Sequence, residues 1–259
     1  MQGELERALA RLSAGSRVRV DGAGRTDAGV HAREQVIAFT YSGRLGRSKL
    51  QAALQALLPP DLSIGPLRRV ETGFNPRYRA TLREYRYVVW NGPRSPLRER
   101  YALGVRERLD VDEMQRAAQV FVGEHDFSAF GGADRQPVRT LHRVDVRRQG
   151  RVITIEVVGT AFLRQMVRRM VAALLRVGRG DATIDQVGEA LSGSRPAFDG
   201  EVAPARGLTL WRVPMGPERK EHNAARRHIK TQASNRTDRS DEQDIHTASR
   251  GHRAQLVRR

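Results

Sequence analysis

Residues 21–32 read D-G-A-G-R-T-D-A-G-V-H-A and place an R-T-D triplet among three glycines. Glycine permits positive φ angles and close approach of other backbone segments, so this run predicts a shaped loop. On either side, residues 17–20 and 34–41 carry short alternating apolar runs that are typical of strands. Charged side chains on a loop held by two strands often form a functional site, although Asp27 capping an amide beside a solvated Arg25 is the simpler alternative.

Hydrophobic periodicity predicts an α+β protein in which helices and strands follow one another along the chain. Strands 82–90 and 138–148 alternate cleanly, and the second pairs with 151–158 as a hairpin. Residues 162–177 form the strongest predicted helix, because apolar residues recur in pairs every four positions. Further helices are expected at 2–13, 47–58, 110–121 and 183–191, further strands at 62–70 and 208–213, and a compact aromatic loop at 123–130.

Composition favours a soluble chain with a polyanionic partner. The sequence of 259 residues has no cysteine, which excludes disulfides and thiolate chemistry and fits a reducing cytoplasm. No run of about 18 apolar residues exists, so no membrane span is expected. The formal net charge is +17, and arginine binds phosphates and stacks on bases, although solvated surface arginines could also account for this charge.

Composition also suggests where the chain divides. A proline- and arginine-rich connection at 93–100 predicts a boundary between an N-terminal half, 1–93, which carries the glycine loop, and a C-terminal half, 94–216. Residues 217–259 contain no Phe, Trp or Tyr and have eleven Lys and Arg against six Asp and Glu. A segment of this kind buries too little apolar surface to offset chain entropy, so a basic disordered tail is expected.

Five stretches, in order, resemble the tRNA pseudouridine synthase A family. The G-R-T-D-A-G-V-H-A run is similar to the signature of that family, and the resemblance extends from Met1 to about Val213. The other matching stretches are F-N-P-R-Y-R-A at 74–80, R-E-Y-R-Y at 83–87, G-E-H-D-F-S-A-F at 123–130 with V-R-T at 138–140, and A-F-L-R-Q-M-V-R-R-M-V at 161–171.

The resemblance implies a role for each matching residue. Asp27 matches the nucleophile, and Arg25 matches the basic residue thought to enter the RNA helix behind the departing nucleotide. Tyr85 matches the tyrosine that stacks on the target base, and Arg168 matches the arginine that pairs with the aspartate. Arg77 and Arg79 are weaker candidates for contact with the RNA backbone.

The same resemblance implies the reaction and the architecture. The substrate would be uridine at positions 38, 39 and 40 of the tRNA anticodon stem-loop, isomerised to pseudouridine without a cofactor or metal. The fold would comprise two ferredoxin-like or RNA-recognition-like halves that share a mixed, mostly antiparallel sheet flanked by helices, with a cleft between them. Family members are homodimers, so a cytoplasmic dimer that docks one tRNA across both subunits is expected.

These residue types suit the chemistry. Isomerisation breaks the C1′–N1 bond and forms a C1′–C5 bond, and a carboxylate can either attack C1′ or help to eliminate the base to a glycal. A guanidinium near the carboxylate favours its ionised form. The stacked target base must be flipped out, which needs a filler and an aromatic platform.

Other interpretations remain open. Tyr85, on an alternating strand, could be a core tyrosine with a bonded hydroxyl, and Arg168 could lie on the polar side of its helix. Three other functions also fit parts of the sequence: a non-catalytic RNA-binding protein, a pseudouridine synthase for another RNA, and a basic ribosome-associated protein. His31 and His125-Asp126 lack the further ligands that a metal site needs.

The chain also departs from the family pattern. Family members have another strand, with a Y-D-G-x-x-F/Y-x-G-W-Q-like motif, ahead of the segment that matches Met1, and our hypothesis is a start codon assigned too late. A sheet without that strand would expose unpaired edges. Asn75-Pro76 is a smaller departure, and the proline could shift Arg77.

Overall fold

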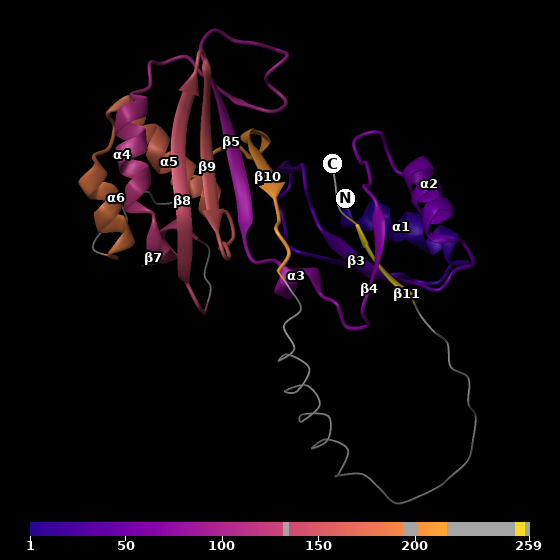
Figure 1. Ribbon diagram of the computed structural model, residues 1–259. Helices are drawn as coiled ribbons and strands as arrows, with labels where there is room; N and C mark the ends of the chain where they lie inside the picture. The colour runs from indigo at the N-terminus through magenta and orange to yellow at the C-terminus, as the bar shows by residue number, and fades with distance from the viewer. Residues whose placement is uncertain (132–134, 194–200, 217–251, 257–259) are drawn as a thin grey trace, which may run out of the picture.

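The computed structural model describes residues 1–131, 135–193, 201–216 and 252–256 (Figure 1). The helices are α1 (Gln2–Leu12), α2 (Arg47–Leu57), α3 (Pro76–Arg79), α4 (Val111–Val120), α5 (Met166–Arg179) and α6 (Ile184–Leu191), with short 3-10 turns η1 (Ser128–Phe130) and η2 (Ala205–Gly207). The strands are β1 (Val20–Gly22), β2 (His31–Ala32), β3 (Ile37–Tyr41), β4 (Leu67–Val70), β5 (Arg83–Asn91), β6 (Leu103–Val105), β7 (Gly123–Asp126), β8 (Val138–Gln149), β9 (Val152–Gly159), β10 (Leu208–Arg212) and β11 (His252–Leu256). Within these ranges, no helix combines the length and apolar character needed to cross a membrane.

The expected α+β class is confirmed, with a mixed sheet flanked by helices. The larger sheet has the order β2-β10-β5-β9-β8-β7, with β6 parallel to β5. Most of its neighbours are antiparallel, whereas β2 runs parallel to β10. The predicted hairpin is present, because β8 and β9 pair across the turn at Gly150 with Gln149 opposite Val152. Helices α4, α5 and α6 lie together on one side of this sheet (Figure 1).

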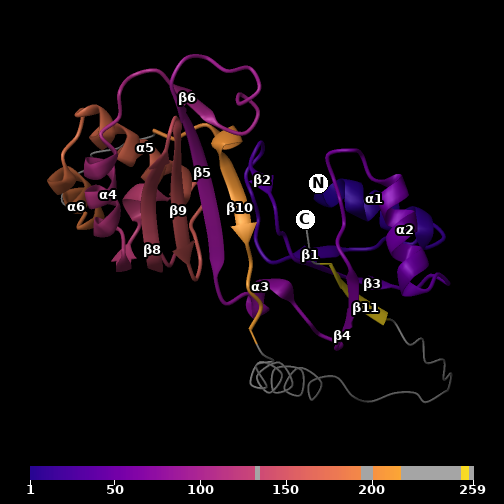
Figure 2. The ribbon, with the colours of Figure 1, turned by 45° about the horizontal axis from the view of Figure 1, so that its top comes forward.

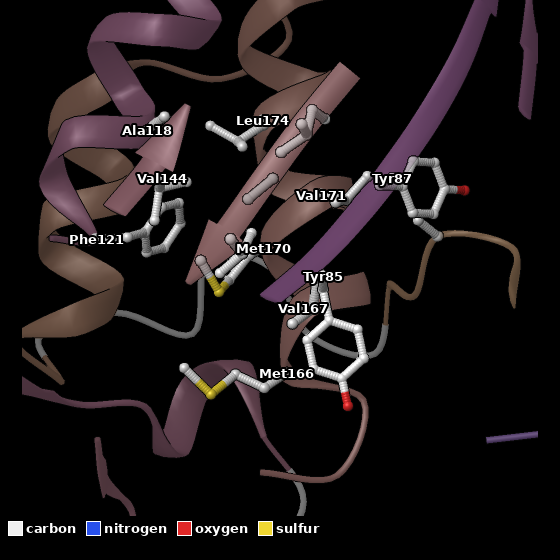
Figure 3. Close-up of a cluster of buried hydrophobic side chains, with 14 of the residues drawn as sticks. Tyr85, Tyr87, Ala118, Phe121, Val144, Met166, Val167, Met170, Val171 and Leu174 are labelled. Carbon is white, nitrogen blue, oxygen red and sulfur yellow. The ribbon is translucent and has the colours of Figure 1, made fainter. Parts of the chain in front are cut away.

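The core of the larger sheet forms where β5 packs against α5. The strand alternates as the sequence predicts, so Tyr85, Tyr87 and Val89 are buried while the intervening residues are more exposed. Figure 3 shows both tyrosines extending from β5 beside Val167 and Val171 of α5. Burial of this apolar stripe stabilises the packing of β5 against α5, at roughly 25 cal/mol per Å² of apolar area removed from water.

A second core lies under the smaller sheet, whose order is β1-β3-β11-β4. Helices α1 and α2 contribute Leu9 and Leu54, which pack in one cluster with Phe39 of β3. Figure 2 shows these helices beside the smaller sheet and distant from α4–α6. The two sheets therefore have separate cores.

Strand β11 is a difference from the sequence expectation. Residues 217–259 were expected to lack regular structure, yet His252–Leu256 lies between β3 and β4 and pairs antiparallel with both. Strand pairing depends on backbone hydrogen bonds, which composition does not report. The rest of the predicted tail lies outside the described residues.

The chain passes from one sheet to the other through the glycine loop. Strand β1 pairs with β3 in the smaller sheet, and β2 pairs with β10 in the larger one, so residues 23–30 connect the two (Figure 2). Where one sheet shared by two halves was expected, the described strands form two sheets, because the loop interrupts the strand pairing between Gly22 and His31. Strand β5, which precedes the expected boundary at 93, pairs within the larger sheet; the division into domains stays a prediction.

Two other elements differ from the pattern-based expectation. Residues 123–130, expected as a loop, form β7 against β8 and then η1. The helix expected from 162 begins at Met166, because Gln165 has φ 61° and ψ 4°, outside the helical region. Phe162 and Leu163 therefore belong to the turn that leads into α5.

Gly207→Ala tests how the buried Tyr87 is held. An added Cβ at position 207 would lie 2.6 Å from Tyr87 Cζ, and the Tyr87 hydroxyl donates to the Pro204 carbonyl at 2.9 Å. We expect the free energy of unfolding in urea to fall by about 1–3 kcal/mol through overpacking. Gly104→Ala, where no neighbouring atom lies within 4 Å of the added Cβ, is the control and should not lower it by more than about 0.5 kcal/mol. Equal effects would contradict this packing account.

Candidate active site

An ion pair joins the glycine loop to helix α5. Arg168 Nη1 lies 2.9 Å from Asp27 Oδ2, and the two side chains are 14% and 29% exposed. Arg168 Nε also donates to the Ala203 carbonyl at 2.7 Å, so the guanidinium is held from two sides. Arg168 follows the buried Val167 at the edge of the apolar stripe, which explains why its charge is half-buried rather than fully solvated.

The loop that carries Asp27 is shaped by its own backbone and by its neighbours. Gly29 has φ 80°, a value that favours glycine, and the Val30 amide donates to the Asp27 carbonyl at 3.1 Å. At the other end of the loop, the Gln35 side-chain amide donates to the Gly24 carbonyl at 2.9 Å. These bonds fix the loop between its strands and present the Asp27 carboxylate to α5.

Arg83 is a further residue of this region that the sequence analysis did not single out. Its guanidinium donates to the carbonyls of Thr160, Ala23 and Arg77 at 2.6, 2.8 and 3.0 Å. One side chain thus joins the glycine loop, the turn before α5 and helix α3. Burial lowers the pKa of Arg83. Its place at the start of the R-E-Y-R-Y strand is the only sequence signal for it.

Tyr85 is buried in the same region, but its hydroxyl differs from that of an ordinary core tyrosine. The ring meets Phe162 edge-on with centroids 5.1 Å apart. The Tyr85 hydroxyl makes no hydrogen bond with the described residues, whereas Tyr87 donates to Pro204. Burial raises the pKa of Tyr85 to about 12, with Asp27 acting in the same direction, so the phenol stays neutral at physiological pH.

The predicted residues mostly converge on one pocket. Arg25, Asp27, Tyr85 and Arg168 line it, and Arg25 is exposed. The remaining lining residues are Thr26, Val30, Phe162, Leu163, Arg164, Gln165, Met166, Val167 and Leu208.

Arg77 lies outside this pocket. It is exposed on α3, a one-turn helix that Asn75 caps by accepting from the Arg77 amide at 2.9 Å and that Pro76 begins. Asn75 and Pro76 therefore serve to begin helix α3, which explains why this pair stands before Arg77.

The arrangement combines a carboxylate, a paired guanidinium, an aromatic ring and an exposed arginine. A carboxylate held in place can act as a nucleophile or a base, and an exposed arginine beside it suits an anionic ligand. Across the described part of the chain, no cluster of three or more His, Asp or Glu side chains is placed to bind a metal ion.

Comparison with known proteins identifies the class. A family model described as tRNA pseudouridine synthase matches residues 117–214, which include β8, β9, α5 and β10. The proteins of that class are isomerases.

Individual relatives extend the match to most of the chain. The tRNA pseudouridine synthase A proteins of Brevibacillus brevis and Pelobacter propionicus are 40% and 42% identical over 217 residues, which cover 82% of this chain and 88% of each relative. The corresponding protein of Geobacter sulfurreducens is 41% identical over 219 residues, with the same coverage. The chain belongs to the tRNA pseudouridine synthase A family, as the ordered motifs predict.

A double-mutant cycle tests the Asp27–Arg168 pair. We expect Asp27→Asn, Arg168→Gln and the double variant to give a coupling free energy of about 0.5–3 kcal/mol in urea unfolding. The exposed pair Arg7–Glu4, whose side chains are 67% and 42% exposed, is the control and should couple by less than about 1 kcal/mol. A coupling no larger than that of the control would contradict a site built on this ion pair.

Arg83→Lys tests whether Arg83 holds the glycine loop. A lysine ammonium is a point charge that cannot donate to three carbonyls in the planar geometry of a guanidinium. We expect amide exchange of residues 23–30 to accelerate by a factor equivalent to about 1.5–3 kcal/mol, the contribution of a charged hydrogen bond. Arg77→Lys is the matched control, because Arg83 uses only the main-chain carbonyl of Arg77. Unchanged exchange in Arg83→Lys would show that the loop is held without it.

Proposed function

We propose that this protein isomerises uridine to pseudouridine at positions 38, 39 and 40 of the tRNA anticodon stem-loop, with Asp27 as the nucleophile. The observation that carries the proposal is the Asp27–Arg168 ion pair at 2.9 Å, in a pocket that Tyr85 also lines. The names of the relatives support the tRNA substrate and the reaction class.

The reaction needs few groups. The C1′–N1 bond breaks, the uracil rotates, a C1′–C5 bond forms, C5 loses its proton and N1 gains one, so no electrons are exchanged with a cofactor. Asp27 either attacks C1′ or removes the C2′ proton to give a glycal. In both routes Arg168 keeps the carboxylate in one position, which removes an ordering cost from the reacting complex.

Base flipping follows from the position of uridine in a structured RNA. The target nucleotide must leave its stack before C1′ can reach Asp27. Arg25 is exposed at the pocket and makes no ion pair with the described carboxylates, so it is available to enter the space left by the nucleotide. The Tyr85 ring then stacks on the flipped base, an interaction typically worth about 1–3 kcal/mol.

Basic surfaces away from the pocket suit the rest of the RNA. Arg77 is exposed on α3, and a second hollow is lined by Arg44, Arg47, Lys49 and Arg69 at the end of β3 distant from the glycine loop. None of these four cations pairs with a carboxylate of the described residues. Phosphates of the tRNA would bind such surfaces with an affinity that falls as salt rises. A cytoplasmic homodimer with the tRNA docked across both subunits completes the proposal.

The decisive measurement is pseudouridine formation by the full chain and its Asp27→Asn variant. A tRNA transcript with anticodon-arm uridines is incubated with each protein, and pseudouridine is mapped by base-specific adducts that stop primer extension. We expect product at positions 38–40 with the full chain, and a rate at least about a thousandfold lower with Asp27→Asn, as for other lost nucleophiles.

Binding of the same transcript is the control, because Asp27→Asn keeps the basic surfaces and should bind tRNA within a few-fold of the full chain. Product from Asp27→Asn would reject this nucleophile. Binding without product from the full chain would favour a non-catalytic RNA-binding protein, and product at other sites would favour a synthase with a different RNA specificity.

A further inference from the structure

Gln165 has an unusual backbone conformation at the edge of the pocket. Its φ of 61° lies in the left-handed region, and among the described residues other than glycine only Ala14 also has a positive φ. Side chains with a Cβ rarely adopt this conformation, whereas glycine and asparagine tolerate it better. Strain of this kind, when observed, is typical of positions kept for function. The backbone conformation at this position does not favour glutamine, so we expect its side chain to have a function.

Among the described residues, no hydrogen bond of the Gln165 side chain explains why a glutamine stands at this position. Gln165 precedes α5 but makes no side-chain capping hydrogen bond. The carboxamide makes no hydrogen bond with the described residues, and it is not among the buried polar groups that lack a partner, so solvent or a ligand can reach it. The residue is half-buried and lines the same pocket as Asp27 and Tyr85. Its amide is thus a free polar group beside the candidate catalytic groups.

The chemistry of a carboxamide matches the base in the proposed reaction. The imide edge of uracil presents the N3–H donor between the O2 and O4 acceptors. A glutamine amide offers one acceptor and two donors in one plane, so it can pair with N3–H and a neighbouring carbonyl at once. Arg25 and Arg168 can only donate, and Asp27 is needed at C1′. Flipped bases are commonly recognised by hydrogen bonds to this edge.

We propose that Gln165 is a specificity-determining residue that pairs with the imide edge of the flipped uracil while Tyr85 stacks on its face. This inference rests on the proposed function, because it assumes that uridine enters the pocket. The left-handed backbone is what turns residues 162–165 away from the helix and along the pocket wall. Cytosine, which carries an N3 acceptor beside an amino group, would be held in the same place only if the amide rotated.

The test compares Gln165→Ala, Gln165→Gly and Gln165→Asn with the full chain on an anticodon hairpin. We expect kcat/KM to fall about 10- to 100-fold in the alanine and glycine variants, the usual effect of losing a bidentate base contact. The glycine variant should nevertheless unfold at higher urea than the full chain, because glycine relieves the positive φ. Gln165→Asn keeps an amide on a shorter stem and should retain more activity than Gln165→Ala. Gln149→Ala, an exposed glutamine on β8, is the matched control and should retain full activity.

A binding measurement separates this inference from the proposed function. In an Asp27→Asn background, which prevents turnover, hairpins carrying uridine or 3-methyluridine at the target position are compared with and without Gln165→Ala. We expect Asp27→Asn to prefer uridine about tenfold or more, and the added Gln165→Ala to lose most of that preference. An unchanged preference, or full kcat/KM in Gln165→Ala, would overturn the role of Gln165. Absence of pseudouridine from the full chain, with the preference still dependent on Gln165, would reject the reaction and leave the base contact standing.

Discussion

The ion pair between Asp27 and Arg168 is the interaction on which the geometry of the site depends. Its partners are 141 residues apart in sequence, one on a loop between two sheets and the other on the most buried helix. Neither side chain would be fixed without the fold around it, because an exposed pair of this kind contributes little. Half-burial makes the electrostatic attraction stronger, and the Ala203 carbonyl orients the guanidinium. The cost of positioning the carboxylate is therefore met when the protein folds, before RNA binds.

The second arginine near the loop works by a different principle. Arg83 donates hydrogen bonds to carbonyl oxygens, which are neutral, so no carboxylate among its hydrogen-bond partners in the described residues cancels its positive charge. Arg25 is likewise without a carboxylate partner in the described residues. The pocket itself combines one carboxylate, Asp27, with Arg25, Arg164 and Arg168, and this local excess of positive charge suits a ligand with phosphates. In the proposed function, arginines that hold the loop or line the pocket would also attract the RNA.

Much of the framework could be predicted from the sequence, because alternation and the 3.6-residue period report burial directly. The hairpin at 138–158 and the faces of β5 follow from that pattern. The convergence of Asp27, Tyr85 and Arg168 does not follow from the pattern, because tertiary packing alone brings together residues that are far apart in sequence. Only the family resemblance predicted it. The role of Arg83 was not predicted, because an arginine at an alternating strand position is expected to face solvent. Its acceptors are backbone carbonyls, which every residue has, so no residue type indicates them. Strand β11 was missed because backbone pairing requires no particular composition.

The start of α5 at Met166 shows that packing of the core determines the shape of the pocket. Periodicity extends the helix back to Phe162, and a continuous helix would satisfy more backbone hydrogen bonds without a strained residue at 165. The strained backbone at Gln165 persists because nearby residues of the same turn are fixed by packing, with Leu163 and Met166 both buried. The unwound turn places Phe162 against Tyr85 and leaves the Gln165 amide open to the pocket. The strained backbone at Gln165 costs about 1–3 kcal/mol. The burial of α5 offsets this cost and so stabilises a pocket wall that local backbone preferences alone would not form.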